Sequence, residues 1–323
     1  MIDPNNIQGV VTAVLTPLDQ RGKPNFDRLQ QHIRVLEQDG SNAFLLLGTT
    51  GEGPSFSVAE RKAIFEAAIQ AAGKMDVMAQ TGCASLTDTI DLTRHAFKAG
   101  LKKVTVIPPF FFKGISDDGL FMYYSQIIEG AVPTEGRLML YHIPQVTQVP
   151  ISFDLVDRLL DTYGKRIGGI KDSAGDIDHL KELCRRFPQI SVFTGNDQLI
   201  LEALRAGAAG CVTGVVNVFA PLAAAIFRAF RSGSREADVY QHQLTMVWTI
   251  LDRYQPYTPL LKALAAVRYQ DSGWLNVRPP LDPMSPGQLE RMLGELRQVD
   301  LPKAYSWISQ AFPIEKGPMR KIL

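Results

Sequence analysis

The sequence predicts an α/β fold, a (β/α)8 barrel of the TIM type with a C-terminal helical appendage. Eight short apolar runs rich in Val, Ile, Leu and Thr alternate with eight amphipathic segments of helical period up to about residue 231. After about residue 232 the alternation stops and only helical segments follow. A doubly wound sheet, the alternative fold, usually has a glycine-rich first turn, whereas Thr16-Pro17-Leu18-Asp19 follows the first apolar run here.

The strands and helices of the barrel can be placed in order. Strands are expected at Gly9–Thr16, Ala43–Gly48, Asp76–Gly82, Lys103–Pro108, Arg137–Ile143, Ile167–Asp172, Ser191–Gly195 and Gly210–Thr213. Helices are expected at about 26–39, 57–72, 86–99, 117–130, 152–163, 176–186, 197–206 and 218–231. Ser57-Val58-Ala59-Glu60 is a capping box that supports a helix start, and Ala99-Gly100 supports a helix end.

The last part of the chain is expected to be helical near 234–252, 258–269, 285–298 and 302–311, with a proline-rich turn at 277–283. We therefore divide the chain into a catalytic barrel, residues 1–232, and a C-terminal helical region, residues 233–323. We expect this second region to serve packing or assembly rather than to form an independent module.

Composition excludes several classes of function. Among 323 residues, 34 Lys and Arg balance 33 Asp and Glu, so neither a nucleic acid nor an anionic membrane is an expected partner. No apolar segment approaches the roughly 20 residues of a membrane span, and residues 1–6 do not resemble a signal peptide. The widely spaced Cys83, Cys184 and Cys211 argue against a disulfide framework. We therefore expect a cytoplasmic protein.

A barrel of this kind carries its active site at the carboxyl ends of the strands. Polar residues at the predicted strand ends are Thr49-Thr50-Gly51-Glu52, Tyr141-His142, Lys171-Asp172-Ser173 and Gly195-Asn196-Asp197. Because neighbouring residues of a strand face opposite sides, His142 is expected to face the helix layer if Tyr141 faces the interior.

Lys171 is the candidate nucleophile. It ends a buried apolar strand, where desolvation disfavours a charged ammonium; the alternative is a solvated lysine just beyond the strand. A neutral amine adds to ketones, and the protonated imine that results is an electron sink. Tyr141 could carry the proton, although a barrel tyrosine can also be structural. The Gly48–Glu52 turn offers hydroxyls and backbone N–H groups for a carboxylate, or it is an ordinary turn.

Three motifs in register resemble one family. They are Gly48-Thr49-Thr50-Gly51-Glu52, Tyr141-His142-Ile143-Pro144 and Gly169-Ile170-Lys171-Asp172-Ser173-Ala174-Gly175-Asp176. Together they are similar to the signatures of the dihydrodipicolinate synthase / N-acetylneuraminate lyase family, as are Gly207–Asn217 and Arg278-Pro279-Pro280-Leu281. The resemblance covers about residues 7–298.

The resemblance implies a class I Schiff-base lyase or aldolase that uses neither a metal nor another cofactor. Its substrates would be pyruvate or another 2-oxo acid and an aldehyde, and the protein would be a homotetramer or homodimer. By this resemblance Lys171 forms the imine and Tyr141 passes protons. Thr49 and Thr50 hold the carboxylate, and Thr50 links Tyr141 into a proton relay.

Further residues follow from the same resemblance. The carbonyl of Val212 is expected near the lysine. Gly195 and Asp197 match positions that contact the distal part of sugar-acid substrates in the lyase branch. These residues complete the predicted site.

Two departures from the family bear on the substrate. The synthase branch has an arginine where this chain has Val146, and tyrosines where it has Phe110-Phe111-Phe112. Phenylalanine cannot relay a proton or donate a hydrogen bond. We therefore expect an aldolase, lyase or dehydratase, for example of 2-keto-3-deoxy sugar acids, rather than 4-hydroxy-tetrahydrodipicolinate synthase proper. Lys113 could bind a distal acidic group, although a solvated loop lysine is the commoner case.

Three other hypotheses fit the sequence less well. A metal-dependent aldolase needs clustered ligands, whereas the five histidines are scattered without an H-x-x-x-H pattern. A phosphate-binding isomerase could use the glycines at 207, 210 and 214, which we interpret instead as sites of close backbone approach. A non-catalytic 2-oxo-acid sensor would not need the nucleophile and proton shuttle that Lys171 and Tyr141 provide.

Overall fold

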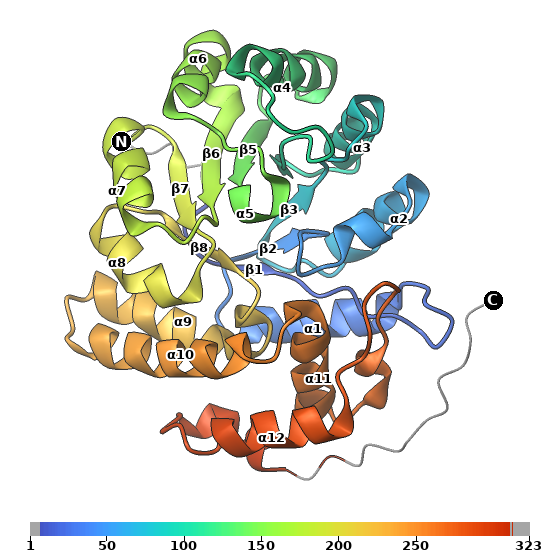
Figure 1. Cartoon of the computed structure of the whole chain (residues 1–323), viewed down its shortest axis with the longest axis vertical. Coiled ribbons are helices and arrows are strands. Elements are labelled where there is room, and N and C mark those ends of the chain that lie inside the picture. Colours follow the sequence, from blue (N-terminus) through green and yellow to red (C-terminus); the bar gives the residue numbers. More distant parts are fainter. Residues whose placement is uncertain (1–6, 311, 313–323) are drawn as a thin grey trace.

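The structure is a computed structural model that describes residues 7–310 and residue 312. Eight parallel strands form a closed barrel in which each strand pairs with its sequence neighbours and β8 pairs with β1 (Figure 1). This confirms the predicted (β/α)8 barrel of the TIM type. The ends of the two predicted regions, residues 1–6 and 313–323, lie outside the described residues.

The strands begin where the sequence predicted them. They are β1 (Gly9–Ala13), β2 (Ala43–Leu46), β3 (Asp76–Gln80), β4 (Lys103–Val106), β5 (Arg137–His142), β6 (Ile167–Asp172), β7 (Ser191–Thr194) and β8 (Gly210–Thr213). β6 and β8 have the predicted bounds, and the other strands end slightly earlier than predicted. The residues beyond these ends belong to the loops that build the site.

The barrel helices also lie close to their predicted positions. They are α1 (Phe26–Gln38), α2 (Val58–Ile69), α3 (Leu86–Lys98), α4 (Asp117–Ala131), α6 (Phe153–Tyr163), α7 (Ile177–Arg186), α8 (Ile200–Arg205) and α9 (Val216–Arg231). The capping box of Ser57 and Glu60 starts α2 as predicted. Short 3-10 segments are η1 (Gly53–Ser55), η2 (Gly164–Arg166) and η3 (Asp197–Leu199), so the helix expected at 197–206 begins as η3. The four-residue α5 (Pro144–Thr147) was not predicted.

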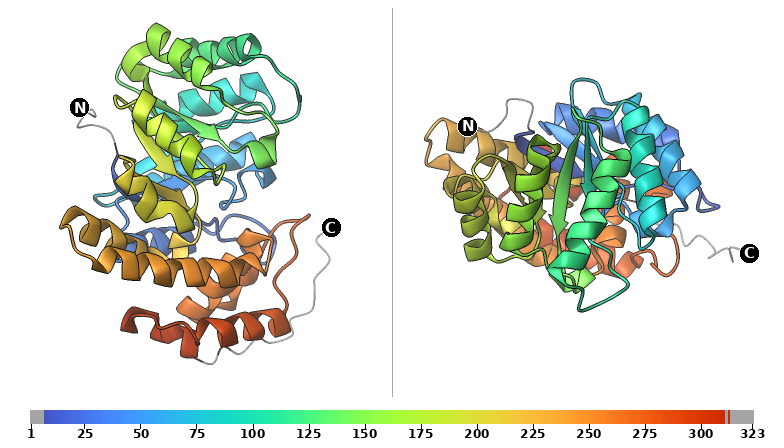
Figure 2. Two further views of the ribbon diagram at one scale, coloured as in Figure 1. Left: turned by 60° about the vertical axis from the view of Figure 1, so that its left-hand side comes forward. Right: turned by 90° about the horizontal axis from the view of Figure 1, so that it is seen from above.

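The C-terminal region consists of α10 (Glu236–Asp252), α11 (Tyr257–Tyr269), η4 (Ser272–Leu275), α12 (Pro286–Leu296) and η5 (Lys303–Ser309). The segment expected as a helix at 302–311 is thus mostly 3-10. These helices form a layer on one side of the barrel (Figure 2). Val10 and Leu15 from the barrel share one apolar cluster with Leu264 and Trp274, so the two regions have a common core.

An apolar cluster occupies much of the barrel interior. It holds Ile7, Val11, Ala43, Leu45, Met78, Met139, Phe193, Ala209 and Val212. Tyr141 follows Met139 by two positions on β5 and therefore faces the same interior. Among the described residues, none of the helices is both long enough and apolar enough to cross a bilayer.

Candidate active site at the carboxyl ends of the strands

Lys171 and Tyr141 are directly opposite each other on the paired strands β6 and β5. Both are buried, with 5% and 2% of their surfaces exposed. The Lys171 ammonium donates a hydrogen bond of 3.1 Å to the Tyr141 hydroxyl and lies 4.2 Å from the centre of the tyrosine ring. The register of two adjacent strands therefore brings the candidate nucleophile and the candidate proton shuttle into contact.

Gly169, two residues before Lys171, lies close to the neighbouring strand β7. A Cβ atom at Gly169 would collide with the backbone carbonyl of Ser191 on β7. β6 and β7 pair in register here, Gly169 opposite Ser191 and Lys171 opposite Phe193. Gly169 thus lets β7 approach β6 closely just before the lysine.

The environment of Tyr141 changes its acidity. Burial raises the pKa of Tyr141, but the neighbouring Lys171 charge and hydrogen bonds from Thr49, Lys171 and Ser173 lower it, and the net pKa is below the ordinary value. A phenol whose pKa is lowered gives up its proton more readily. This is the property that a proton shuttle requires.

Thr49 and Thr50 lie in the loop after β2, but they face different partners. The Thr49 hydroxyl is 3.4 Å from the Tyr141 hydroxyl. The Thr50 hydroxyl packs on Gly214, where a Cβ atom would lie 2.7 Å from it, and the Thr50 carbonyl accepts a hydrogen bond of 3.2 Å from Thr258. In this structure the contact with Tyr141 therefore comes from Thr49, whereas the resemblance assigned the relay to Thr50.

The loop is held by a buried ion pair that the sequence analysis did not identify. Glu52 adopts a left-handed conformation (φ 57°), and its carboxylate is paired with the Lys262 ammonium of α11. Neither side chain is exposed to solvent. Burial lowers the pKa of Lys262, although Glu52 opposes this effect. Glu52 is thus a structural anchor and does not face the barrel interior with Thr49.

Asp197 is a buried carboxyl at the end of β7. Burial raises its pKa to about 7, although the nearby Thr213 hydroxyl and Lys171 charge favour the ionised form. Its Oδ1 atom has no hydrogen-bond partner among the described residues. Gly195 precedes it, and any side chain at that position would collide with Ser173. Asp197 is therefore a buried carboxyl with one unpartnered oxygen, close enough to Lys171 for the lysine charge to affect its pKa.

Val212 lies on β8 with its side chain in the barrel interior, opposite Val11 of β1. Both neighbours in the sequence are polar or thiol side chains, Cys211 and Thr213. Burial raises the pKa of Cys211 to about 12, so its thiol is not a nucleophile at neutral pH.

Three potential metal ligands lie on β5, β6 and α7. His142, Asp172 and His179 have ligand atoms within 4.8 Å of one another. The imidazole rings stack nearly parallel, 4.7 Å apart and inclined by 19°, so their in-plane lone pairs do not converge on one point. His142 Nδ1 accepts a hydrogen bond of 3.1 Å from Ile151 N–H, and Asp172 lies 2.9 Å from His179 Nδ1. We interpret the cluster as a structural link, with His142 in the helix layer as predicted.

Protonation of the two histidines differs. Burial lowers the pKa of His142 to about 4, whereas the hydrogen bond between His179 and Asp172 raises the pKa of His179. The cluster therefore holds one neutral and one more basic imidazole around a single carboxylate. It joins α7 to the strands that carry Tyr141 and Lys171.

A comparison with models of protein families identifies the family of this chain. The model of the dihydrodipicolinate synthetase family matches residues 6–298. The chain belongs to this family. A lyase of Chloroflexus aurantiacus described as DapA-like and uncharacterized is 41% identical over 279 residues, which are 86% of this chain and 92% of the relative.

The chain is also similar to a named synthase and to a crystal structure of a family member. A 4-hydroxy-tetrahydrodipicolinate synthase of Hydrogenobaculum is 32% identical over 213 residues, 66% of this chain and 71% of the relative. The crystal structure of the E. coli K12 prophage protein YagE in complex with pyruvate superposes with a TM-score of 0.85 at 25% identity. That superposition covers 91% of this chain and 99% of YagE.

The positions at which this chain departs from the synthase pattern lie in the loop after β4 and in α5. Phe110 packs against the cluster that contains Tyr141, while Phe111, Phe112 and Val146 are largely exposed. The Lys113 ammonium is bound to the carbonyls of Phe110 and Thr147, the second at 2.8 Å. Lys113 therefore links the loop after β4 to α5.

Sequence analysis missed several residues of the site because their partners are remote. Ser173, two residues after Lys171, lowers the pKa of Tyr141 through a hydrogen bond, whereas the sequence placed it only in a polar strand end. Lys262 pairs with a residue 210 positions earlier. One signal was available: Lys262 is a lone charge among Leu260, Leu261 and Leu264, and a charge on an apolar helix face implies a buried partner.

Proposed function

We propose that the protein is a class I lyase or aldolase that forms a Schiff base between Lys171 and pyruvate or another 2-oxo acid. The observation that supports this most strongly is the buried contact of 3.1 Å between Lys171 Nζ and the Tyr141 hydroxyl. A binding protein needs no such pair of nucleophile and proton shuttle. The complex of YagE with pyruvate supports the same substrate class.

In the proposed first half-reaction, Lys171 gives up its ammonium proton and the resulting amine attacks the ketone carbon of the 2-oxo acid. Tyr141 transfers protons while the C–O bond breaks, and water leaves as the iminium ion forms. We propose that Thr49, Thr50 and the backbone N–H groups of their loop hold the substrate carboxylate. The hydroxyl of Thr49 then serves both the carboxylate and Tyr141.

In the second half-reaction the iminium accepts an electron pair. Removal of the proton from a hydroxyl at C4 breaks the C3–C4 bond, an aldehyde leaves, and an enamine remains. Protonation at C3 and hydrolysis by water release pyruvate and the free Lys171 amine. Condensation with an aldehyde is the reverse sequence. We propose that Asp197 and Gly195 contact the distal part of the substrate, and that the Val212 carbonyl lies beside the imine nitrogen.

We propose that the residues of α5 and of the loop after β4 favour cleavage, condensation or dehydration of a different 2-oxo acid over the synthase reaction proper. Val146 and Phe111 supply no charge or hydroxyl, and the Lys113 ammonium is already bound to two backbone carbonyls. The alternatives are 4-hydroxy-tetrahydrodipicolinate synthase, a 2-keto-3-deoxy sugar acid dehydratase and a non-catalytic 2-oxo-acid sensor. Turnover assays with a panel of 2-oxo acids separate these alternatives.

The proposal can be tested without knowledge of the aldehyde. Enamine formation exchanges the methyl protons of pyruvate with solvent, so in D2O the methyl proton NMR signal should decay with wild-type protein and not with Lys171→Ala. Folded wild-type protein that does not exchange pyruvate or longer 2-oxo acids would contradict the proposal and favour the sensor.

Two further proposals concern the cellular location and the oligomeric state of the protein. The free cysteines Cys83, Cys184 and Cys211 are compatible with a reducing cytoplasm, the location we propose. A homotetramer or homodimer is proposed from the family resemblance, and light scattering of the purified protein measures its mass directly.

A further inference from the structure

The loop that carries Thr49 and Thr50 has little conformational freedom of its own. It turns through left-handed conformations at Leu47 (φ 55°) and Glu52 (φ 57°). A Cβ atom at Gly51 would lie 2.7 Å from the Val14 carbonyl, so the loop backbone presses on the segment after β1. The Gly51 carbonyl also accepts a hydrogen bond of 2.8 Å from Thr16. The backbone between Leu47 and Glu52 is therefore closely packed on both sides of Thr49.

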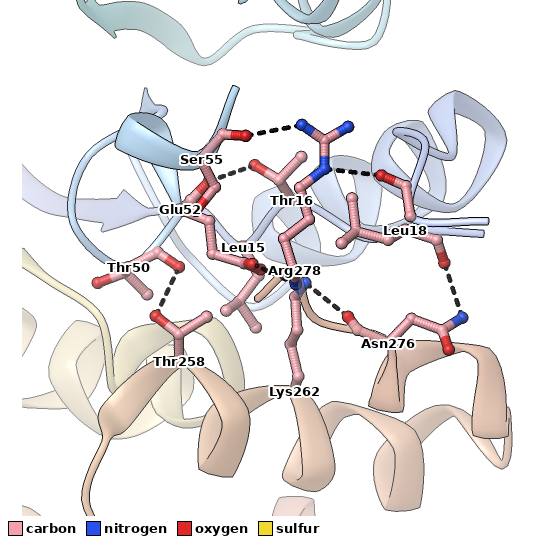
Figure 3. Close-up of polar contacts among 12 residues, drawn as sticks. Leu15, Thr16, Leu18, Thr50, Glu52, Ser55, Thr258, Lys262, Asn276 and Arg278 are labelled. Carbon is pink, nitrogen blue, oxygen red and sulfur yellow. Dashed lines mark hydrogen bonds and ion pairs between the residues drawn. The ribbon is translucent and has the colours of Figure 1, made fainter. Parts of the chain in front are cut away.

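The other end of the loop is fixed by the C-terminal region (Figure 3). Lys262 of α11 pairs with the Glu52 carboxylate and donates a hydrogen bond of 2.8 Å to the Asn276 carbonyl. The second carboxylate oxygen of Glu52 accepts a hydrogen bond of 3.2 Å from Arg278 N–H. One turn before Lys262, the hydroxyl of Thr258 donates to the Thr50 carbonyl. Helix α11 and the segment after it thus hold both Thr50 and Glu52.

We propose that Lys262 is a positioning residue of the active site, acting through Glu52 to set the distance between Thr49 and Tyr141. This inference rests on the proposed function, in which Thr49 binds the substrate carboxylate and Tyr141 transfers protons. It makes the C-terminal helical region part of the catalytic apparatus.

The geometry explains why a charged pair is suited to this role. The Thr49–Tyr141 contact is 3.4 Å long, at the outer limit of a hydrogen bond, so a shift of a few tenths of an ångström abolishes it. A hydrogen-bonded ion pair fixes both the distance and the direction between its groups, whereas an apolar contact is non-directional. Lys262 and Glu52 touch none of the reacting groups, so their effect is indirect.

A second ion pair on the same helix supplies a matched control. Arg268 of α11 is paired with Asp39 at 2.7 Å, and both side chains are mostly buried. Asp39 follows α1, which runs back from the active-site end of the barrel to the opposite end. Loss of this pair loosens α11 from the barrel without touching the Thr49 loop.

The experiment compares Lys262→Met, Arg268→Met and the double variant Glu52→Gln/Lys262→Met. The double variant leaves no unpaired buried charge, so it is expected to fold even if Lys262→Met does not. The first readout is the pKa of Tyr141 in the ligand-free protein, measured by NMR of 13Cζ-labelled tyrosine and assigned with Tyr141→Phe. The second is the KM and kcat of pyruvate methyl exchange.

We expect both Lys262 variants to raise the Tyr141 pKa and to raise KM for pyruvate by about tenfold, the loss of roughly one hydrogen bond, while Arg268→Met changes neither. A wild-type Tyr141 pKa and KM in a folded Lys262 variant would overturn the proposal, as would equal changes in Arg268→Met. If wild-type protein does not exchange pyruvate, the proposed function fails, yet the Tyr141 titration still decides whether Lys262 positions the loop.

Discussion

Replacement of Tyr141 by Phe removes a single oxygen atom from the centre of the site. That oxygen accepts the hydrogen bond from Lys171 at 3.1 Å and contacts the Thr49 hydroxyl at 3.4 Å. The ring, 4.2 Å from Lys171 Nζ, and its packing against Ile107 and Ile143 are retained. The variant therefore tests proton transfer with little disturbance of the fold.

The expected magnitude follows from the role assigned to the hydroxyl. A positioned acid–base group contributes about 10²–10⁴-fold to the rate, which corresponds to about 3–5 kcal/mol of barrier. We expect Tyr141→Phe to lower kcat for pyruvate methyl exchange by this factor with a smaller change in KM. The fall in rate that ionisation of Tyr141 causes at high pH should also be absent.

Tyr124→Phe is the matched control. Tyr124 is a fully buried tyrosine of α4 whose hydroxyl donates to the Val106 carbonyl at 3.4 Å, in the helix layer. It should keep exchange within about twofold of wild type, because its hydroxyl is worth roughly 1 kcal/mol of stability and takes no part in the reaction. A Tyr141→Phe variant that exchanges pyruvate as fast as Tyr124→Phe would refute the role of Tyr141.

Three further predictions concern stability. Asp197 has a pKa raised to about 7, so its contribution is present below the unfolded pKa and is lost as pH rises through 7. By urea unfolding, Asp197→Asn should therefore be up to about 4 kcal/mol more stable than wild type at pH 8 and about equally stable at pH 4. It should also turn over less of the proposed substrate. Equal stability of the two proteins at pH 8 would contradict this prediction. His32 is buried with its pKa lowered to about 4, so the unfolded chain binds a proton first as pH falls below 6.5. Wild type should lose up to about 3 kcal/mol more than His32→Gln between pH 6.5 and 4, and parallel curves would contradict this. Gly169→Ala places a methyl group against the Ser191 carbonyl and should lower the free energy of unfolding by at least about 1–3 kcal/mol. In Gly100→Ala the added methyl group meets no neighbour, so this variant measures only the cost of a positive φ.

Much of the barrel could be predicted because its signals are local. Each strand is a short apolar run ended by turn residues, as Ile167–Asp172 illustrates, and each helix has a period that buries one face. The contact of Lys171 with Tyr141 was also accessible, since residues at the ends of adjacent strands meet in a barrel. Short segments were not accessible: the four residues of α5 are too few to show a period.

The remaining features depend on contacts that no local pattern encodes. Thr49 and Thr50 are adjacent and chemically alike, and only the loop backbone decides that Thr49 faces Tyr141. The pairing of Glu52 with Lys262 depends on how α11 docks against the barrel. Such contacts between the barrel and the C-terminal region require the tertiary structure.

The central claim is that Lys171 is the Schiff-base nucleophile. Incubation with pyruvate and borohydride, followed by intact-mass spectrometry and peptide mapping, tests it most directly. We predict one reduced pyruvyl adduct on Lys171 of the wild type and none on Lys171→Ala. An adduct on another lysine, or equal labelling of the variant, would contradict the claim.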